Sequence, residues 1–479
     1  MVVKSQSIDL LQEEKAIYQF LYACYEQYCR TNIAKIASFS QPLNDIDPLA
    51  AFQCLLRDDR QHFYWEHPKT REAVFGHGAV KLLEIDSSDS SSSGDRFVRT
   101  RNFMQDCLKQ IVYPQSSTQS EANPYFFSSF TFFPTSNSIA YPFPVATIFL
   151  PQFQVIRKNN CCFFVANIAI TKTLNIKLAV EEITRTIKKI CQFRLNILSS
   201  TPQPQTYFNL QEKIRNEDNF KIAVKSALQS IQKHQLSKIV LAHPLDLISP
   251  VPFRIIESLQ NLRQNYPNCY LFAIGNDRGY RFIGASPERA IGLQNQQLIT
   301  DALAGSAPRG KTPREDTQLA QQLLKSEKDK REHQAVSEFI LQCLEKLGLQ
   351  VRRSPLQVLQ LDNIQHLHVQ ISARVPQNLH PLDIVAKLHP TPAVAGVPTQ
   401  IACDRIRRYE NFDRALYAAP LGWVDARGNS EFIVGIRSAA IAGDRARLYA
   451  GAGIVAGSDP ERELAEVRLK LQAMRRALI

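Results

Sequence analysis

The sequence of 479 residues has no apolar run of roughly 18 residues, so no membrane-spanning helix is expected. Its N-terminal stretch lacks an apolar segment and carries acidic residues early, which is not typical of a secretory signal. Ten cysteines are spread from Cys24 to Cys403 without a CxxC pair, so neither a structural zinc site nor a disulfide framework is indicated. These absences favour a cytoplasmic protein with reduced cysteines and no membrane partner.

The sequence also lacks a concentrated basic tract, although 57 Lys and Arg residues exceed 45 Asp and Glu residues. Because the excess is spread along the chain, it predicts a positive field for a small polyanionic substrate and no nucleic-acid partner. A basic binding module without catalytic activity stays open as an alternative, and its affinity for nucleic acid would fall steeply with salt.

The arrangement of strands and helices favours an α+β fold with antiparallel sheets. No internal repeat stands out, and strand patterns come in groups between helices instead of alternating with them one for one. A serine-rich tract at residues 86–95 is typical of a mobile surface loop, and the proline-bearing stretch 199–206 marks a boundary. Helical patterns cover residues 9–29, 177–193, 218–235 and 317–347, and a last helix runs to the C-terminus.

The last helix carries a charged stripe that either faces solvent or forms part of a site. It begins at SDPEREL, where Ser458 is the expected N-cap and Glu461 completes a capping box. Glu463, Glu466 and Lys470 then share one side of the helix. Most such charged stripes face solvent, but the glycine-rich strand before this helix would let a ligand approach the backbone closely.

A second carboxylate pair, Asp329 and Glu332, lies within the 317–347 helical pattern, where the apolar periodicity lapses between Lys325 and Gln334. This turn faces either water or a polar cavity. Two helices that each offer paired carboxylates could hold one magnesium ion through one or two ligands, with water filling the other positions.

Residues 305–312, GSAPRGKT, match the phosphate-binding P-loop pattern GxxxxGK[ST]. Two prolines argue against that function. Pro313 disfavours helical geometry at Thr312, and Pro308 removes a backbone N–H that would bind phosphate. A nucleotide-binding protein sensitive to Lys311→Ala therefore remains only a remote alternative.

Seven motifs, in order, resemble those of the chorismate-utilising enzymes, which comprise isochorismate, salicylate, anthranilate and aminodeoxychorismate synthases. The resemblance runs from about Phe220 to Lys470. The first 200 residues resemble the longer isochorismate synthases of quinone pathways more weakly, through FYWEHP (63–68) and FGHGAV (75–80). The seven motifs are SKIVLAH (237–243), FIGASPE (282–288), LAGS (303–306), SEKDKREH (326–333), HPTPAVAG (389–396), GIRSA (435–439) and YAGAGIVAGSDPERE (449–463).

The resemblance implies a fold like that of anthranilate synthase component I: two packed, mostly antiparallel sheets flanked by helices. Residues 1–210 would contribute to a shared core, residues 215–476 would form the chorismate-binding catalytic region, and a monomer is expected. The implied activity is the magnesium-dependent conversion of chorismate to isochorismate.

The resemblance also implies roles for individual residues. Lys238 would be the general base that activates water, and Glu288 the general acid that protonates the departing hydroxyl. Glu332 and Glu466 would bind Mg²⁺, with Asp329 and Glu463 as close companions. The positions implied to contact chorismate are Ala304, Gly305, Ser306, His366, Ala393, Tyr417, Arg437, Gly453 and Lys470.

Two positions favour isochorismate as the product. Amine-adding members usually carry glutamine where Lys238 stands, so lysine favours water as the nucleophile. Members that eliminate pyruvate tend to carry threonine where Ala393 stands, so the reaction is expected to stop at isochorismate. Tyr417 departs from the phenylalanine of some isochorismate synthases, and a salicylate synthase stays open as the first alternative.

Overall fold

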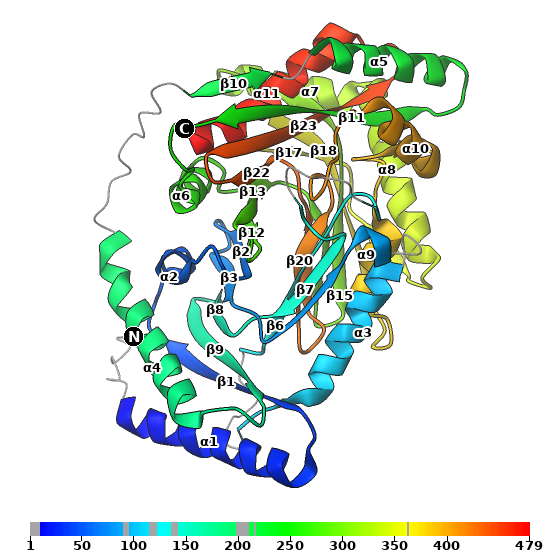
Figure 1. Ribbon diagram of the computed structural model, residues 1–479. Helices are drawn as coiled ribbons and strands as arrows, with labels where there is room; N and C mark the ends of the chain where they lie inside the picture. The colour runs from blue at the N-terminus through cyan, green and yellow to red at the C-terminus, as the bar shows by residue number, and fades with distance from the viewer. Residues whose placement is uncertain are drawn as a thin grey trace.

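The computed structural model describes residues 10–89, 95–114, 122–135, 142–197, 210–214, 217–361 and 364–479. Over these residues the chain forms two large sheets with helices on their outer faces (Figure 1). None of the described helices is both long and apolar enough to cross a membrane.

The first sheet contains strands from both ends of the chain. In the described ranges its strand pairings are antiparallel, except that of β1 with β5, which is parallel. In spatial order its described strands are β10 (Gln211–Ile214), β11 (Lys238–Ile248), β23 (Arg445–Val455), β22 (Ser438–Ala442), β13 (Tyr280–Ser286), β12 (Tyr270–Gly275), β2 (His62–His67), β3 (Glu72–His77), β8 (Phe153–Lys158), β9 (Cys161–Ile170), β1 (Lys35–Leu43) and β5 (Ile111–Val112), with β19 (Gly396–Val397) beside β11.

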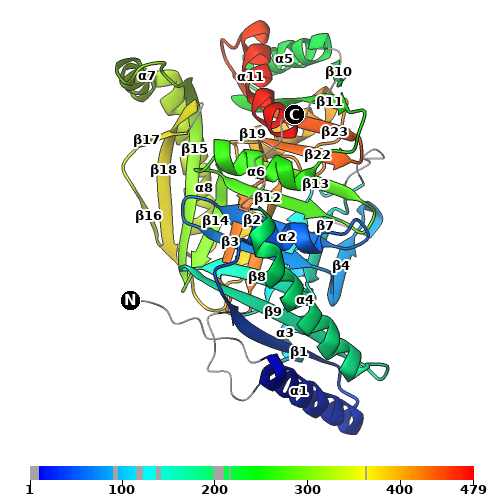
Figure 2. The ribbon, with the colours of Figure 1, turned by 90° about the vertical axis from the view of Figure 1, so that its left-hand side faces the viewer.

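The second sheet is antiparallel at each of its strand pairings in the described ranges. Figure 2 shows its strands β15 to β18 on the opposite side of the molecule from β11, β22 and β23. In spatial order its strands are β16 (Val351–Arg353), β18 (Ile364–Arg374), β15 (Gln297–Pro308), β14 (Arg289–Gln294), β21 (Ser430–Val434), β20 (Pro420–Asp425), β6 (Tyr125–Phe130), β7 (Ala146–Leu150) and β4 (Lys81–Ile85), with β17 (Gln357–Gln360) beside β18.

Aromatic side chains pack the two sheets face to face. Phe63 of β2 stacks on Phe127 of β6 with ring centroids 4.6 Å apart, and Gly76 of β3 leaves the space that the Phe127 ring occupies. Burial of such rings is a major source of stability. The predicted α+β fold with two packed antiparallel sheets is confirmed, and both sheets take strands from both halves of the chain.

Helices cover the outer face of each sheet. Buried side chains of α3, α8 and α9 belong to an apolar cluster that packs against the second sheet. The first sheet is contacted by α1, α2, α4, α5, α6, α10 and α11. Their bounds are α1 (Leu10–Thr31), α2 (Pro48–Leu55), α3 (Asp95–Gln110), α4 (Ile176–Ile197), α5 (Glu217–Gln232), α6 (Ile255–Asn265), α7 (Pro313–Lys325), α8 (Glu327–Glu345), α9 (Pro381–Leu388), α10 (Thr399–Tyr409) and α11 (Pro460–Leu478).

Two local predictions about helices are wrong. The 317–347 pattern is two helices, because Ser326 ends α7 and caps α8 by accepting a hydrogen bond from the backbone of Asp329. The N-cap of α11 is Asp459, which accepts from the backbone N–H of Arg462, whereas the Ser458 hydroxyl accepts from Val455.

The P-loop alternative loses its structural basis. Residues 305–308 belong to β15, where Ser306 pairs with His366 and Ala307 with Gln365. Thr312 is extended and caps α7. The segment is therefore a strand end and a helix start, without the loop that would wrap a phosphate.

Parts of two loop predictions lie outside the described residues. In the serine-rich tract, Ser87–Asp89 form a short 3-10 helix and Asp95 begins α3, but residues 90–94 are not described. The predicted boundary at 199–206 lies wholly outside the described ranges.

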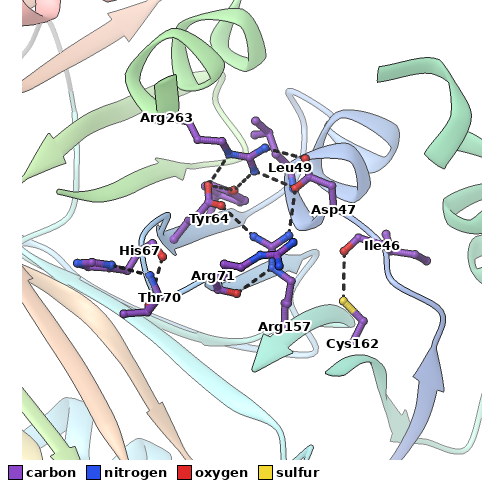
Figure 3. A network of polar contacts seen from close by, with 11 residues as sticks. Ile46, Asp47, Leu49, Tyr64, His67, Thr70, Arg71, Arg157, Cys162 and Arg263 are labelled. Carbon is purple, nitrogen blue, oxygen red and sulfur yellow. Dashed lines mark hydrogen bonds and ion pairs between the residues drawn. The ribbon is translucent and has the colours of Figure 1, made fainter. Parts of the chain in front are cut away.

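A network of charges joins the two halves of the chain (Figure 3). Arg263 of α6 lies between Asp47, at the start of α2, and the hydroxyl of Tyr64 on β2. Its Nε also donates to Glu66 at 2.8 Å, and Arg157 of β8 donates to the other Glu66 oxygen at 3.0 Å. Glu66 is only 1% exposed, so both guanidinium groups depend on a buried carboxylate.

Replacing Glu66 by glutamine is expected to lower the free energy of unfolding by about 3 kcal/mol, because two arginines lose their shared buried counter-charge. Urea unfolding of both proteins measures the difference. As a control, Asp106→Asn removes the exposed pair with Lys109 and should change stability by less than about 0.5 kcal/mol. Equal effects of the two substitutions would contradict the importance of the buried network.

Candidate active site

Every site residue predicted from the sequence lines one cavity of about 210 Å³. The cavity lies where ends of the two sheets meet α8 and α11. Strands β11 and β23 contribute from the first sheet, and β15 and β18 from the second. The structure thus brings together side chains that are more than 200 residues apart in the chain.

Lys238 lies at the start of β11, a strand that is buried along most of its length. Its Nζ is 2.9 Å from Oε1 of Glu332 on α8, and its side chain is almost fully buried. Gly453 of β23 passes close to this pair: a Cβ there would lie 3.3 Å from Cε of Lys238 and 3.3 Å from Oε1 of Glu332. A side chain at this position would therefore crowd the ion pair and require it to shift by a few tenths of an ångström.

Glu288 lies between β13 and β14, and its backbone N–H donates to the hydroxyl of Ser286. Burial raises the pKa of the Glu288 carboxyl to about 7, and the nearby negative charge of Asp301 adds to this effect while Lys238 opposes it. Because the neutral acid is well populated near pH 7, this carboxyl can donate a proton under physiological conditions.

The four carboxylates on α8 and α11 face the same cavity. Burial would raise the pKa of Glu332, but the ammonium of Lys238 outweighs it and holds that pKa below its usual range. Burial raises the pKa of Glu463, and the neighbouring charge of Glu466 contributes in the same direction. Two like charges held close together are what a bound cation would stabilise.

These residues fit a magnesium ion of the expected kind. Carboxylate oxygens are the protein ligands that Mg²⁺ prefers, and it usually keeps several waters. In the described ranges no three His, Cys, Asp or Glu side chains are gathered into a ready metal-binding group. An ion bound by one or two carboxylates of α8 and α11, with water and substrate as its other ligands, does not require such a group.

Cationic and backbone groups lie next to the carboxylates of the cavity. Lys470 of α11 is 2.8 Å from Glu466 and donates to the carbonyl of Gly451 at 2.9 Å. Gly305 has a φ of +72° at an irregularity in the β15–β18 pairing, and a Cβ there would lie 3.0 Å from Cβ of Asp329. A side chain at this position would therefore be both strained and crowded.

His366 on β18 is neutral at physiological pH. Burial, with the positive charges of Arg437 and Lys470, lowers its pKa to about 3. Its Nδ1 lies 3.3 Å from the carbonyl oxygen of Gly305. Since the carbonyl can only accept, Nδ1 carries the hydrogen and Nε2 is left as an acceptor.

Among the polar and charged side chains of the cavity, sequence reasoning did not single out two. Lys328 lies beside Asp329 in the motif SEKDKREH, and Tyr449 of β23 stacks on Tyr417 with centroids 5.1 Å apart. Both fall within recognised motifs, so their position was a usable signal. Lys328 adds a cation beside the carboxylates of α8.

A larger cavity of about 450 Å³ contains none of the predicted site residues. It lies on the other side of Pro287 and Leu303, which line both cavities. The smaller cavity is the candidate active site despite its size, because it brings together Lys238, Glu288 and the four carboxylates.

Comparisons with known proteins agree with this geometry. The family described as chorismate binding enzyme matches residues 19–479. The isochorismate synthase MenF of Bacillus subtilis is 29% identical over 452 residues, which cover 93% of this chain and 94% of that protein.

Two solved structures share the fold. The menaquinone-specific isochorismate synthase MenF from Escherichia coli matches with a TM-score of 0.75 and 25% identity, covering 97% of this chain and 100% of that one. Anthranilate synthase component I from Streptococcus pneumoniae matches with a TM-score of 0.67 and 19% identity, covering 86% and 92%. The predicted likeness to the anthranilate synthase fold is confirmed.

Proposed function

The chain belongs to the family of chorismate-binding enzymes, and from this premise we propose that it is an isochorismate synthase, adding water at C2 of chorismate and expelling the C4 hydroxyl. The observation that carries the proposal is that Lys238 and the protonatable Glu288 line one cavity with both carboxylate pairs.

The two residues supply the proton transfers that the reaction needs. Water is a weak nucleophile and hydroxide a poor leaving group, so the exchange requires a base and an acid at separate positions. In its neutral amine form, Lys238 takes a proton from the attacking water through Nζ and becomes an ammonium paired with Glu332. Glu288 gives its proton to the departing hydroxyl, which leaves as water.

The remaining residues of the cavity hold the substrate. The carboxylates of chorismate are bound by Arg437, Tyr417, Lys470, Gly453 and the backbone at Ala304 to Ser306. His366 lies near the ring, and Ala393 also contacts the substrate. Fixing both carboxylates places C2 and C4 opposite the base and the acid, which lowers the entropic part of the barrier.

We also propose that Glu332 and Glu466 bind Mg²⁺, with Asp329 and Glu463 beside them. When bound, the ion would neutralise a substrate carboxylate and orient the ring. The support is the carboxylate chemistry of α8 and α11, where burial and the neighbouring charge of Glu466 raise the pKa of Glu463.

Replacing Glu332 by glutamine is expected to raise the half-saturating Mg²⁺ concentration by about tenfold, because a carboxylate ligand is lost. Calorimetric titration of Mg²⁺ into the substrate-free protein measures this independently of turnover. The matched control is Glu327→Gln on the same helix, an exposed residue paired with Lys330. An unchanged titration for Glu332→Gln would remove this residue from the metal site.

Incubating the purified protein with chorismate and Mg²⁺ tests the function. Isochorismate without pyruvate is the expected product, whereas salicylate with pyruvate would identify a salicylate synthase and overturn the interpretation of Ala393. No consumption of chorismate would reject the proposal. Neither ATP nor polynucleotide should affect turnover, and Lys311→Ala should leave it unchanged.

The relatives' names favour a quinone pathway for the product. MenF from Escherichia coli is a menaquinone-specific isochorismate synthase, and its structure matches 97% of this chain, so the match includes the long N-terminal half. We further propose a monomeric enzyme in the cytoplasm, where its ten free cysteines would remain reduced.

A further inference from the structure

A fully buried ion pair lies directly behind the candidate active site. Glu410 follows α10, and Arg414 comes four residues later. Their side chains are only 3% and 1% exposed. Nε of Arg414 donates to Oε2 of Glu410 at 2.8 Å, and Nη2 donates to Oε1 at 2.6 Å. The pair does not line the cavity.

The other hydrogen bonds of this pair reach the backbone of two segments that carry site residues. Arg414 donates to the carbonyl of Val240 at 2.8 Å and to that of Val394 at 2.9 Å. Glu410 accepts from the N–H of Ala242 at 2.7 Å. Val240 is two residues beyond Lys238 on β11, and Val394 directly follows Ala393.

Arg414 also connects to a third site segment through its own backbone. Its carbonyl accepts from the N–H of Tyr417 at 2.8 Å, and its guanidinium lies 4.4 Å from the ring centroid of Phe132. A single arginine thus joins β11 and the loop with Ala393 through its guanidinium, and the turn with Tyr417 through its backbone.

A buried ion pair of this kind adds little net stability to a protein interior. Removing two charges from water costs about as much as their attraction returns, so apolar residues could give similar stability. Apolar side chains could not hold β11 and the loop with Ala393 at a fixed distance from each other, because they form no directional bonds to the backbone.

We propose that the Glu410–Arg414 pair is a positioning device that fixes Lys238, Ala393 and Tyr417 relative to one another for the reaction. The inference rests on the proposed function, because it assigns Lys238 the role of base. Neither residue touches substrate, so both act through the backbone of their neighbours.

The proposal predicts a split between kcat and KM. The groups that would bind the substrate carboxylates lie on β15, before β22, on β23, on α11 and at Tyr417. In the described ranges, no side-chain hydrogen bond of the pair reaches these groups. Loosening the pair should therefore misplace the base while leaving the carboxylate-binding groups in position. A shift of the base by about 1 Å can lower kcat about 100-fold.

The test compares Arg414→Lys with the matched control Arg263→Lys in purified full-length protein, measuring kcat, KM and the thermal unfolding midpoint. Lysine keeps the charge but cannot donate in the planar fork that reaches Glu410 and two carbonyls at once. We expect Arg414→Lys to lower kcat about 100-fold with KM changed less than about threefold. Arg263→Lys, in the network of Figure 3, should lower the midpoint and leave kcat unchanged.

A lower midpoint for Arg414→Lys with wild-type kcat per folded molecule would overturn the proposal, since the pair would then only stabilise the fold. A second variant, Glu410→Gln, should reproduce the loss of kcat, because Arg414 loses its counter-charge and can reorient. Wild-type protein assayed beside them separates the two hypotheses: inactivity of the wild type would reject the proposed function, whereas active wild type with equally active variants would reject the positioning role.

Discussion

Replacing Lys238 by alanine is expected to lower kcat by about 10⁴-fold while chorismate still binds, because the substitution removes the proposed base. The groups that would hold the substrate carboxylates come from other elements, so the dissociation constant should stay within a few-fold of the wild-type value. Lys238 Nζ lies 2.9 Å from Glu332 and lines the cavity from β11, whereas the cavity's other two lysines, Lys328 and Lys470, come from α8 and α11.

Turnover and chorismate binding need to be measured separately, by product chromatography and by fluorescence or calorimetric titration. Lys330→Ala, which removes an exposed lysine of α8 that pairs with Glu327, is the matched control and should behave as wild type. If Lys238→Ala kept substantial turnover, Lys238 would not be the base. If it lost binding as well, the residue would serve to hold substrate.

The sequence predicts the residues of the site better than it predicts the ends of the helices that carry them. The charged stripe Glu463, Glu466 and Lys470 faces the cavity, as the glycine-rich strand before it suggested. The break at Ser326 went unpredicted although Ser326 and Asp329 have the spacing of a capping box. Because the apolar periodicity continues on both sides of Ser326, the pattern predicts one helix and hides the N-cap that separates α7 from α8.

Contacts between distant segments could not be derived from local patterns. The ion pair of Lys238 with Glu332 joins residues far apart in sequence, and the burial that shifts the pKa of Glu288 depends on how two sheets close over it. The Glu410–Arg414 pair had the spacing of an ordinary exposed helical pair. Only the packed structure shows that it is buried against the backbone of β11.

Replacing Glu288 by glutamine is expected to lower kcat by about 10³-fold and to abolish one limb of the pH profile. Burial and Asp301 raise the pKa of Glu288 to about 7, against the opposing charge of Lys238. The acid form is therefore present below about pH 7 and is lost above it. In the wild type, kcat/KM should fall as the pH rises through this value, and glutamine, which does not titrate, should remove that fall.

Asp301→Asn gives the directional check. Asp301 bonds to Arg289 at 2.9 Å and to His368 at 2.9 Å, and its charge favours the protonated form of Glu288. The pKa of Glu288 should fall in this variant, because the negative charge of Asp301 is lost and the positive charge of Arg289 is no longer balanced by it. The descending limb should then move to lower pH while activity well below the limb persists. A limb that stays in place in both variants would assign it to another group and leave Glu288 without the role of acid.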